Sequence, residues 1–277
     1  MAARKPQPLH SMGKLVLLGA GKMGHAMLDG WLARGLNPRK ITVIEPQPGK
    51  TIKALTRRGL KLNTKGKSDA ASAVVIAVKP QTAPEALPAL AAHIGKTTLV
   101  LSIMAGRTIG FLQQSLPQAT AIVRAMPNTP AAVGRGITTA CPNARVSARQ
   151  RKLAADLLAA VGAVEWVADE SLMDAVTALS GSGPAYVFLL AEAMTKAGIA
   201  AGLPADLASR LARETVAGSG ELLRRSDLDA ATLRQNVTSP GGTTAAALEV
   251  LMGPDGFDAL LTKAIAAATR RGKELAG

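Results

Sequence analysis

A glycine-rich turn near the start of the chain has the residues and spacing to bind a dinucleotide. The run Gly19 to Gly24, Gly-Ala-Gly-Lys-Met-Gly, fits the G-x-G-x-x-G pattern. It follows a short apolar run, Lys14 to Leu18, that predicts a buried parallel strand, and it opens a segment with helical spacing, Met23 to Arg34. A strand before the turn and a helix after it are the context that favours a dinucleotide site over an ordinary glycine-rich connection. The residues expected to bind the cofactor here are Gly19, Gly21, Lys22, Met23 and Gly24.

An acidic residue lies where a ribose contact would need it. Glu45 closes a second predicted strand, Ile41 to Ile44, 21 residues after Gly24. A carboxylate at that place accepts hydrogen bonds from the ribose hydroxyls of NAD and repels the 2′-phosphate of NADP. Lys50 and Lys53 lie nearby, and their positive charges would attract the 2′-phosphate of NADP. The residues therefore favour NADH and leave NADPH open.

Two further segments follow predicted strands and should lie at the same edge of the sheet. They are Ala77 to Pro80, at the end of the strand Val74 to Val78, and Ile103 to Gly106, after the strand Thr98 to Ile103. Parallel sheets of this kind bind ligands at the carboxyl ends of their strands. The alternative for Lys79-Pro80 is a simple strand terminator, since Pro cannot continue a central strand.

Two loops in the second half of the chain could hold a substrate. Ser180 to Tyr186 enters a predicted helix, and so does Asn236 to Thr244. Consecutive glycines before a helix leave backbone N–H groups free to converge on an anion such as a carboxylate. The hydroxyl of Thr244 could donate to a ring nitrogen. The alternative is a pair of capped loops between helices.

The order of the elements predicts an α/β fold. Strands alternate with helices up to a fifth strand, Thr120 to Arg124, which predicts a Rossmann-type, doubly wound parallel sheet. Beyond about Trp166 the segments are Ala- and Leu-rich and helical, and Ala185 to Ala197 carries so few charges that burial on both sides, as in a dimer interface, is expected. The helical segments are Leu172 to Leu179, Ala185 to Lys196, Pro204 to Leu223, Ala230 to Gln235, Thr244 to Leu251 and Gly256 to Leu275. The expected domains are a flexible N-terminal extension (1–13), a dinucleotide-binding Rossmann domain (14–165) and an all-helical dimerisation and substrate domain (166–277).

Composition excludes several classes of protein. The 277 residues carry a net charge of +14, but the basic residues are scattered and aromatics are 2% of the chain, so we expect no nucleic-acid partner. No apolar run suggests a signal peptide or a membrane span. With Cys141 as the single cysteine and no metal-ligand spacing among the three histidines, a soluble, cytoplasmic protein without a bound metal is expected.

Five motifs together resemble one family, the pyrroline-5-carboxylate reductases, and the resemblance covers nearly the whole chain from Lys14 onward. They are Gly19 to Gly24, Ala77 to Pro80 (Ala-Val-Lys-Pro), Arg124 to Pro130 (Arg-Ala-Met-Pro-Asn-Thr-Pro), Ala178 to Tyr186 (Ala-Leu-Ser-Gly-Ser-Gly-Pro-Ala-Tyr) and Asn236 to Thr244 (Asn-Val-Thr-Ser-Pro-Gly-Gly-Thr-Thr). The last two are the most specific, whereas many dehydrogenases share the first.

The resemblance implies NAD(P)H-dependent reduction of the imine of 1-pyrroline-5-carboxylate to L-proline, the last step of proline biosynthesis. Members of the family are homodimers, often assembled into rings, whose active site is completed across the dimer. Beyond the glycine turn, and Glu45, which is expected from its spacing, the cofactor-binding residues are expected to be Ala77, Val78, Lys79, Pro80, Ala105 and Asn128, with Met126 beside the nicotinamide. The implied substrate-binding residues are Ala105, Asp227, Asn236, Ser239, Gly241, Gly242, Thr243 and Thr244.

Within that resemblance, the backbone of Gly241 to Thr244 would hold the substrate carboxylate and Thr244 would be the catalytic residue, bonded to the ring nitrogen. No other side chain of the motifs resembles a dedicated acid, so the proton would come from solvent or the substrate. Members that prefer NADPH carry a small polar residue where this chain has Glu45.

Two rival functions each share one feature with this chain. β-Hydroxyacid dehydrogenases share the opening turn, but they carry a catalytic lysine where this chain has Val187. A non-catalytic protein that senses a nucleotide or binds nucleic acid is suggested only by the net charge.

Overall fold

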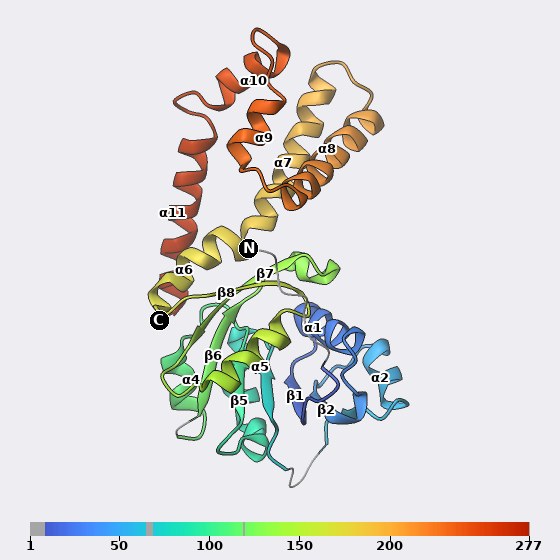
Figure 1. The fold of residues 1–277 in the computed structure, drawn as a ribbon, viewed down its shortest axis with the longest axis vertical. Coiled ribbons are helices and arrows are strands. Elements are labelled where there is room, and N and C mark those ends of the chain that lie inside the picture. The colour runs from blue at the N-terminus through green and yellow to red at the C-terminus, as the bar shows by residue number, and fades with distance from the viewer. Residues whose placement is uncertain (1–8, 65–68, 119, 277) are drawn as a thin grey trace. The chain divides into compact units, whose positions relative to one another are not determined.

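The structure is a computed structural model that describes residues 9–64, 69–118 and 120–276. Within these ranges eight strands form one sheet in the order β3-β2-β1-β4-β5-β6-β7-β8 (Figure 1). Neighbouring strands are parallel except β6 and β7, which are antiparallel. The strands are β1 (Leu15–Leu18), β2 (Ile41–Ile44), β3 (Lys61–Leu62), β4 (Ala73–Ile76), β5 (Leu99–Ser102), β6 (Ala121–Met126), β7 (Gly136–Pro142) and β8 (Gly162–Trp166).

Helices cover both faces of this sheet (Figure 1). Because successive side chains of a strand point to opposite faces, neighbours along β1 belong to different cores. Leu17 packs in the core that contains Trp31 and Leu157, whereas Leu18 packs in the core that contains Leu112. The helices of this part are α1 (Lys22–Ala33), α2 (Lys50–Thr56), α3 (Ala83–Ala86), α4 (Ile109–Ser115), α5 (Ala148–Leu158) and α6 (Met173–Val176). The predicted doubly wound sheet is confirmed.

The antiparallel pair is the main difference from the predicted sheet, which was expected to be parallel throughout. The turn Thr129–Val133 joins β6 to β7, and the whole connection is too short for the crossover that parallel neighbours require. Neither β7 nor β8 was expected from the sequence. β7 and β8 are parallel neighbours, and Gly136 and Gly162 lie opposite each other in them, so close that a Cβ on Gly162 would lie 1.8 Å from the Gly136 carbonyl oxygen.

The chain divides into two compact units, Met1–Gly181 together with Thr269–Gly277, and Ser182–Ala268. The strands end at Trp166, but the first unit continues through α6 and a π-helical turn, Thr177–Gly181. The predicted boundary near residue 165 therefore marks the end of the sheet, and the compact unit extends beyond it.

The structure describes the predicted N-terminal extension, 1–13, only from Leu9 onward. Residues 1–8 lie outside the described part of the chain. Residues 9–13 are not flexible but packed: Leu9 and Met12 are buried in the core beside α1, and the Leu9 N–H donates to the Arg34 carbonyl at 2.9 Å.

The second unit is helical, as predicted. Its helices are α7 (Gly183–Ala200), α8 (Ala205–Arg225), α9 (Ala230–Asn236), α10 (Thr243–Leu251) and most of α11 (Phe257–Ala276). Helices α7 and α8 approach closely where a Cβ on Gly198 would lie 3.2 Å from that of Ala208. None of α7's residues, all of which the structure describes, is buried in the single chain, and Phe188 is 67% exposed. No helix in the described ranges has the length and apolar content to cross a membrane.

Candidate cofactor and substrate site

The glycine turn joins β1 to α1 with its backbone closely packed at two glycines and open at a third. Gly19 has φ of +86°, and a Cβ there would lie 2.8 Å from the backbone of Ala77. A Cβ on Gly24 would lie 2.5 Å from the Gly19 carbonyl oxygen. At Gly21, the N-cap of α1, a Cβ would meet nothing within 4 Å. The turn therefore leaves space at Gly21, beside a helix N-terminus to which no side chain is bonded.

The turn lies where the strand order reverses. From β1 the chain proceeds outward to β2 and β3, and then returns to β4 on the other side of β1. The Ala77 N–H donates to the Leu18 carbonyl at 2.7 Å, so the ends of β1 and β4 lie side by side. Such a switch point at the carboxyl ends of the strands is where doubly wound sheets bind ligands. A dinucleotide's pyrophosphate would meet the free N–H groups of α1 there.

Glu45 turns its carboxylate toward the glycine turn. One oxygen accepts from the Ala20 N–H at 2.8 Å and the other from the Gln47 N–H at 3.0 Å. The half-buried carboxylate is therefore fixed beside the turn by backbone donors.

Asn63 holds Glu45 and was missed in the sequence. Its amide oxygen accepts from the Glu45 N–H, and its amide nitrogen donates to the Glu45 carbonyl, both at 2.8 Å. Asn63 has a φ of +49°, and Asn is among the few residues that adopt this left-handed conformation readily. No motif or spacing in the sequence points to it.

The two later loops lie at the same edge of the sheet. Lys79 is exposed, and Pro80 begins a short 3-10 turn after β4. Val78 is half-buried, and its side chain lies 2.8 Å from where a Cβ on Gly19 would be. Ala105 is exposed in the loop between β5 and α4. The structure thus brings the segments Ala77 to Pro80 and Ile103 to Gly106 to the edge that carries the glycine turn.

Asn128 follows β6 and joins two other segments. Its amide oxygen accepts from the Ile137 N–H at 2.9 Å, and its amide nitrogen lies 3.4 Å from the Ser180 hydroxyl. A Cβ on Gly181 would lie 2.4 Å from the Met126 methyl group. The π-helical turn that carries Ser180 and Gly181 is therefore packed against the end of β6, and π-helices are rare and frequent at functional sites.

The proposed substrate loop lies in the second unit and ends at α10. Gly241 has a φ of +68°, and Gly242 is the N-cap of α10 without a side-chain cap. Thr243 and Thr244 are the first two residues of this helix, and Ser239 is exposed before it. The first turn of α10 thus presents backbone N–H groups and two hydroxyls.

Asp227 precedes α9 and Asn236 ends it. Asp227 is exposed just before this helix, whose N-cap is Asp229, and Asn236 is its last residue.

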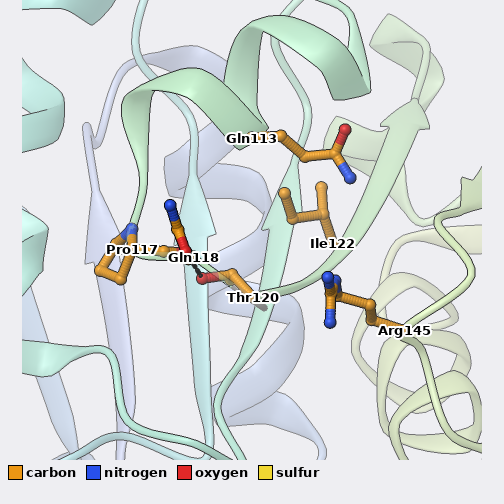
Figure 2. Close-up of a pocket in the computed structure, with 6 residues that line it drawn as sticks. All are labelled: Gln113, Pro117, Gln118, Thr120, Ile122 and Arg145. Carbon is orange, nitrogen blue, oxygen red and sulfur yellow. Dashed lines mark hydrogen bonds between the residues drawn. The ribbon is translucent and has the colours of Figure 1, made fainter.

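A hollow elsewhere in the first unit is not part of this site. It has a volume of about 200 Å³ and lies around Thr120, just before β6, so it lies at the amino end of the strand (Figure 2). Its lining residues are Gln113, Pro117, Gln118, Thr120, Ile122 and Arg145. The carboxyl edge that carries the glycine turn is the opposite one.

In the described part of the chain no three His, Cys, Asp or Glu side chains gather as metal ligands would. Cys141 is buried in β7, and burial raises the pKa of its thiol, with a smaller contribution from the Glu170 carboxylate. A raised pKa and burial are typical of an inert structural cysteine.

A glycine turn at the switch point of a doubly wound sheet, followed by a helical unit, defines the class of dinucleotide-binding oxidoreductases. Residues 14–106 match the family model described as "NADP oxidoreductase coenzyme F420-dependent", and residues 170–275 match that described as "Pyrroline-5-carboxylate reductase dimerisation".

Similar proteins cover nearly the whole chain. The pyrroline-5-carboxylate reductase of Pseudomonas aeruginosa is 40% identical over 96% of this chain and 98% of its own, and that of Synechocystis is 39% identical over 95% and 98%. The solved structure of the Coxiella burnetii enzyme has a TM-score of 0.88 at 35% identity, covering 96% of this chain and 100% of that one. The Plasmodium falciparum enzyme with NADP bound has a TM-score of 0.77 at 30% identity, covering 97% and 99%. The chain belongs to the pyrroline-5-carboxylate reductase family.

Proposed function

We propose that this protein reduces the imine of 1-pyrroline-5-carboxylate to L-proline with NADPH or NADH, the last step of proline biosynthesis. The observation that carries the proposal is the similarity to curated pyrroline-5-carboxylate reductases over 96% of the chain, at 40% identity. Both motifs most specific to the family, Ser180 to Tyr186 and Asn236 to Thr244, lie inside the matched dimerisation region.

The described residues fit a dinucleotide. The pyrophosphate would lie over Gly21, where a side chain would take its place, and would accept from the free N–H groups at the start of α1. Lys22 and Met23 begin that helix, and the segment Ala77 to Pro80 would border the cofactor on the β4 side. Asn128, held by Ile137 and Ser180, would lie beside the nicotinamide.

The choice of cofactor depends on Glu45. Its carboxylate is fixed beside the turn and would accept from the ribose hydroxyls while repelling a 2′-phosphate. The matched N-terminal family model and the Plasmodium structure concern NADP. We propose that both cofactors serve, with Glu45 raising the relative use of NADH.

When bound, the reduced nicotinamide supplies the hydride for the imine carbon. The chain's own residues then have to orient the substrate. We propose that the backbone of Gly241 to Thr244 binds the carboxylate, with Ser239, Asn236 and Asp227 around it, and that Ala105 lies between the substrate and the nicotinamide ring. A fixed carboxylate presents one face of the imine, which is the orientation effect that such a reaction requires.

Thr244 is the proposed catalytic residue. Its hydroxyl, in the first turn of α10, would hydrogen-bond the ring nitrogen and polarise the imine. Thr244→Val keeps the shape and removes the hydroxyl, so kcat should fall by about tenfold or more, since one hydrogen bond to a reacting group is worth about 1–2 kcal/mol. Thr244→Ser should restore most of the loss. Equal kcat in the wild type and Thr244→Val would exclude this role.

The dimerisation region indicates a homo-oligomer, and we propose a homodimer that assembles into a ring of dimers. Light scattering on purified protein measures this directly. We also propose that the enzyme acts in the cytoplasm, because a free cysteine such as Cys141 stays reduced there.

The proposed reaction is tested by the absorbance of the reduced nicotinamide. The purified protein is mixed with 1-pyrroline-5-carboxylate and either NADPH or NADH, and the product is identified as proline by chromatography. Consumption of cofactor that depends on the imine supports the proposal. No consumption of either cofactor would refute it.

A further inference from the structure

A single carboxylate joins the start of α4 to strand β6. Oε1 of Glu170 accepts from Nη1 of Arg124 at 2.8 Å and from the backbone N–H of Ile109 at 2.8 Å. The Arg124 side chain is only 5% exposed and that of Glu170 is 29% exposed. Charge-assisted hydrogen bonds sheltered from water in this way are among the stronger ones in proteins.

The bond to Ile109 fixes the end of the loop that carries Ala105. This loop begins after β5, where the Ile103 N–H donates to the Ile76 carbonyl at 3.0 Å. It ends at Ile109, the first residue of α4, and Thr108 caps the same helix by accepting from the Phe111 N–H at 3.1 Å. The Glu170 carboxylate at this N-terminus is also favoured by the helix dipole.

The middle of the loop is held from the other side. The Arg107 guanidinium donates from Nε and Nη2 to the Pro80 carbonyl at 3.2 and 3.1 Å, and it lies 4.6 Å from the centre of the Phe111 ring. The loop is thus fixed at its start, at Arg107 and at Ile109. Ala105 and Gly106 remain as its tip.

Arg124 connects the same carboxylate to β6. Arg124 lies opposite Ser102 of β5 and two residues before Met126 along its own strand. Glu170 therefore joins the start of α4 to the strand that leads to Asn128. All of these residues belong to one compact unit of the chain.

We propose that Glu170 is a positioning residue of the reductase: through Ile109 it holds the loop 103–108, and hence Ala105, in place for hydride transfer. The inference rests on the proposed function. Arg124 holds the carboxylate in position for this bond. A purely stabilising ion pair would need only the charge of the carboxylate, whereas holding Ile109 needs only an acceptor oxygen, so substitution can separate the charge from hydrogen-bond acceptance.

Glu170→Gln and Glu170→Ala make that separation. The amide oxygen of glutamine can accept both bonds, so Glu170→Gln keeps the loop in place and leaves the Arg124 charge uncompensated. Its thermal stability should fall, because a buried charge without its partner is costly, while kcat stays within about threefold of the wild type. Glu170→Ala loses both bonds. Its kcat should fall by about tenfold or more, because small displacements at a reacting centre are costly. The KM for NADPH should stay within about twofold, since the glycine turn is untouched.

A double variant and a neighbouring control keep the test independent of folding. Arg124→Met with Glu170→Ala removes the unpaired charge and still leaves Ile109 without its acceptor, so the loss of kcat should persist while stability returns. Asp169→Ala removes the adjacent carboxylate, which accepts hydrogen bonds from the N–H and the hydroxyl of Ser171 in its own segment, and should leave kcat unchanged.

Hydrogen exchange gives a readout that needs no substrate. The peptide that covers residues 103–112 should exchange faster in Glu170→Ala and in the double variant, and at the wild-type rate in Glu170→Gln. Wild-type exchange there in Glu170→Ala would overturn the proposal, and so would equal losses of kcat in Glu170→Gln and Glu170→Ala. If the wild type itself consumes no cofactor with the imine, the proposed function fails, and the exchange data still decide whether Glu170 holds the loop.

Discussion

Two glycines of the same turn should respond to alanine in opposite ways. Gly21 has φ of −64° and ψ of −170°, a conformation open to any residue, and a methyl group there would meet nothing within 4 Å. Alanine reduces the entropy of the unfolded chain by about 0.4–1 kcal/mol and is a poorer N-cap than glycine by a similar amount. These effects nearly cancel, so the stability of Gly21→Ala without cofactor should equal that of the wild type.

Gly24→Ala should instead destabilise the fold. The new methyl carbon would lie 2.5 Å from the Gly19 carbonyl oxygen and 3.2 Å from the Ala77 methyl carbon, where real Cβ atoms keep at least 3.0 Å. Both neighbours belong to the ends of central strands, so α1 must move by about half an ångström. Overpacking of this kind costs about 1–3 kcal/mol, which in a chain of this size lowers the melting temperature by several degrees.

Cofactor binding should be weakened in Gly21→Ala, the variant whose stability is unchanged. In Gly21→Ala the methyl group takes space that the pyrophosphate would occupy, so the Kd for NADPH should rise at least about tenfold, or 1.4 kcal/mol, with no loss of stability. Thermal unfolding without cofactor and fluorescence titration with NADPH measure the two quantities on the same samples. Wild-type affinity in Gly21→Ala would show that no pyrophosphate lies over Gly21. A melting temperature as low as that of Gly24→Ala would show that the space at Gly21 is not free.

Three further outcomes are expected. Glu45→Gln should raise the ratio of kcat/KM for NADPH to that for NADH by about tenfold or more, because two like charges about 5 Å apart repel by about 1 kcal/mol in water and by about 3 kcal/mol near a protein surface. An unchanged ratio would show that Glu45 does not influence the choice of cofactor. Burial lowers the pKa of His93, whose Nδ1 meets no hydrogen-bond partner among the described residues. Below pH 6.5, the ordinary pKa of histidine, His93 is protonated in the unfolded chain but stays neutral in the folded chain. The free energy of unfolding should therefore fall as the pH drops below 6.5. His93→Leu should flatten this dependence in urea titrations between pH 7 and 5, and identical slopes would contradict it. Cys141 should react with a thiol reagent at pH 8 only after unfolding, since burial raises its pKa, and rapid labelling of the native protein would disprove its burial.

The strands that could be predicted are those in which most positions are apolar. Runs such as Leu15–Leu18 and Ala73–Ile76 are buried on both faces, so the sequence has no reason to alternate and the run itself is the signal. The strand Gly162–Trp166 alternates half-buried and exposed residues, and Gly136–Pro142 contains two threonines, so neither stands out as an apolar run. Their pairing depends on tertiary contacts that no local pattern records.

The candidate site also contains residues that could be predicted from the sequence and residues that could not. The glycine turn could be predicted because the pyrophosphate constrains backbone conformation at fixed spacing. Glu170 could not, because its partner Arg124 is 46 residues away and an exposed-looking Asp-Glu-Ser segment gives no sign of burial. Asn63 likewise acts through a left-handed conformation that becomes visible only in the fold. Side chains that hold other side chains leave little trace in sequence spacing.

The apolar surface of α7 would make the stability of the helical unit depend on the concentration of the protein. Phe188 and Leu189 are 67% and 61% exposed in the single chain, on a helix that buries none of its residues there. A partner protomer that covered these side chains would bury them only on association, so part of the stability of the helical unit would then belong to the assembly and would scale with protomer concentration. Dilution would then lower the melting temperature of the protein. A cell that makes little of the chain would hold a smaller folded fraction of it, as well as fewer copies.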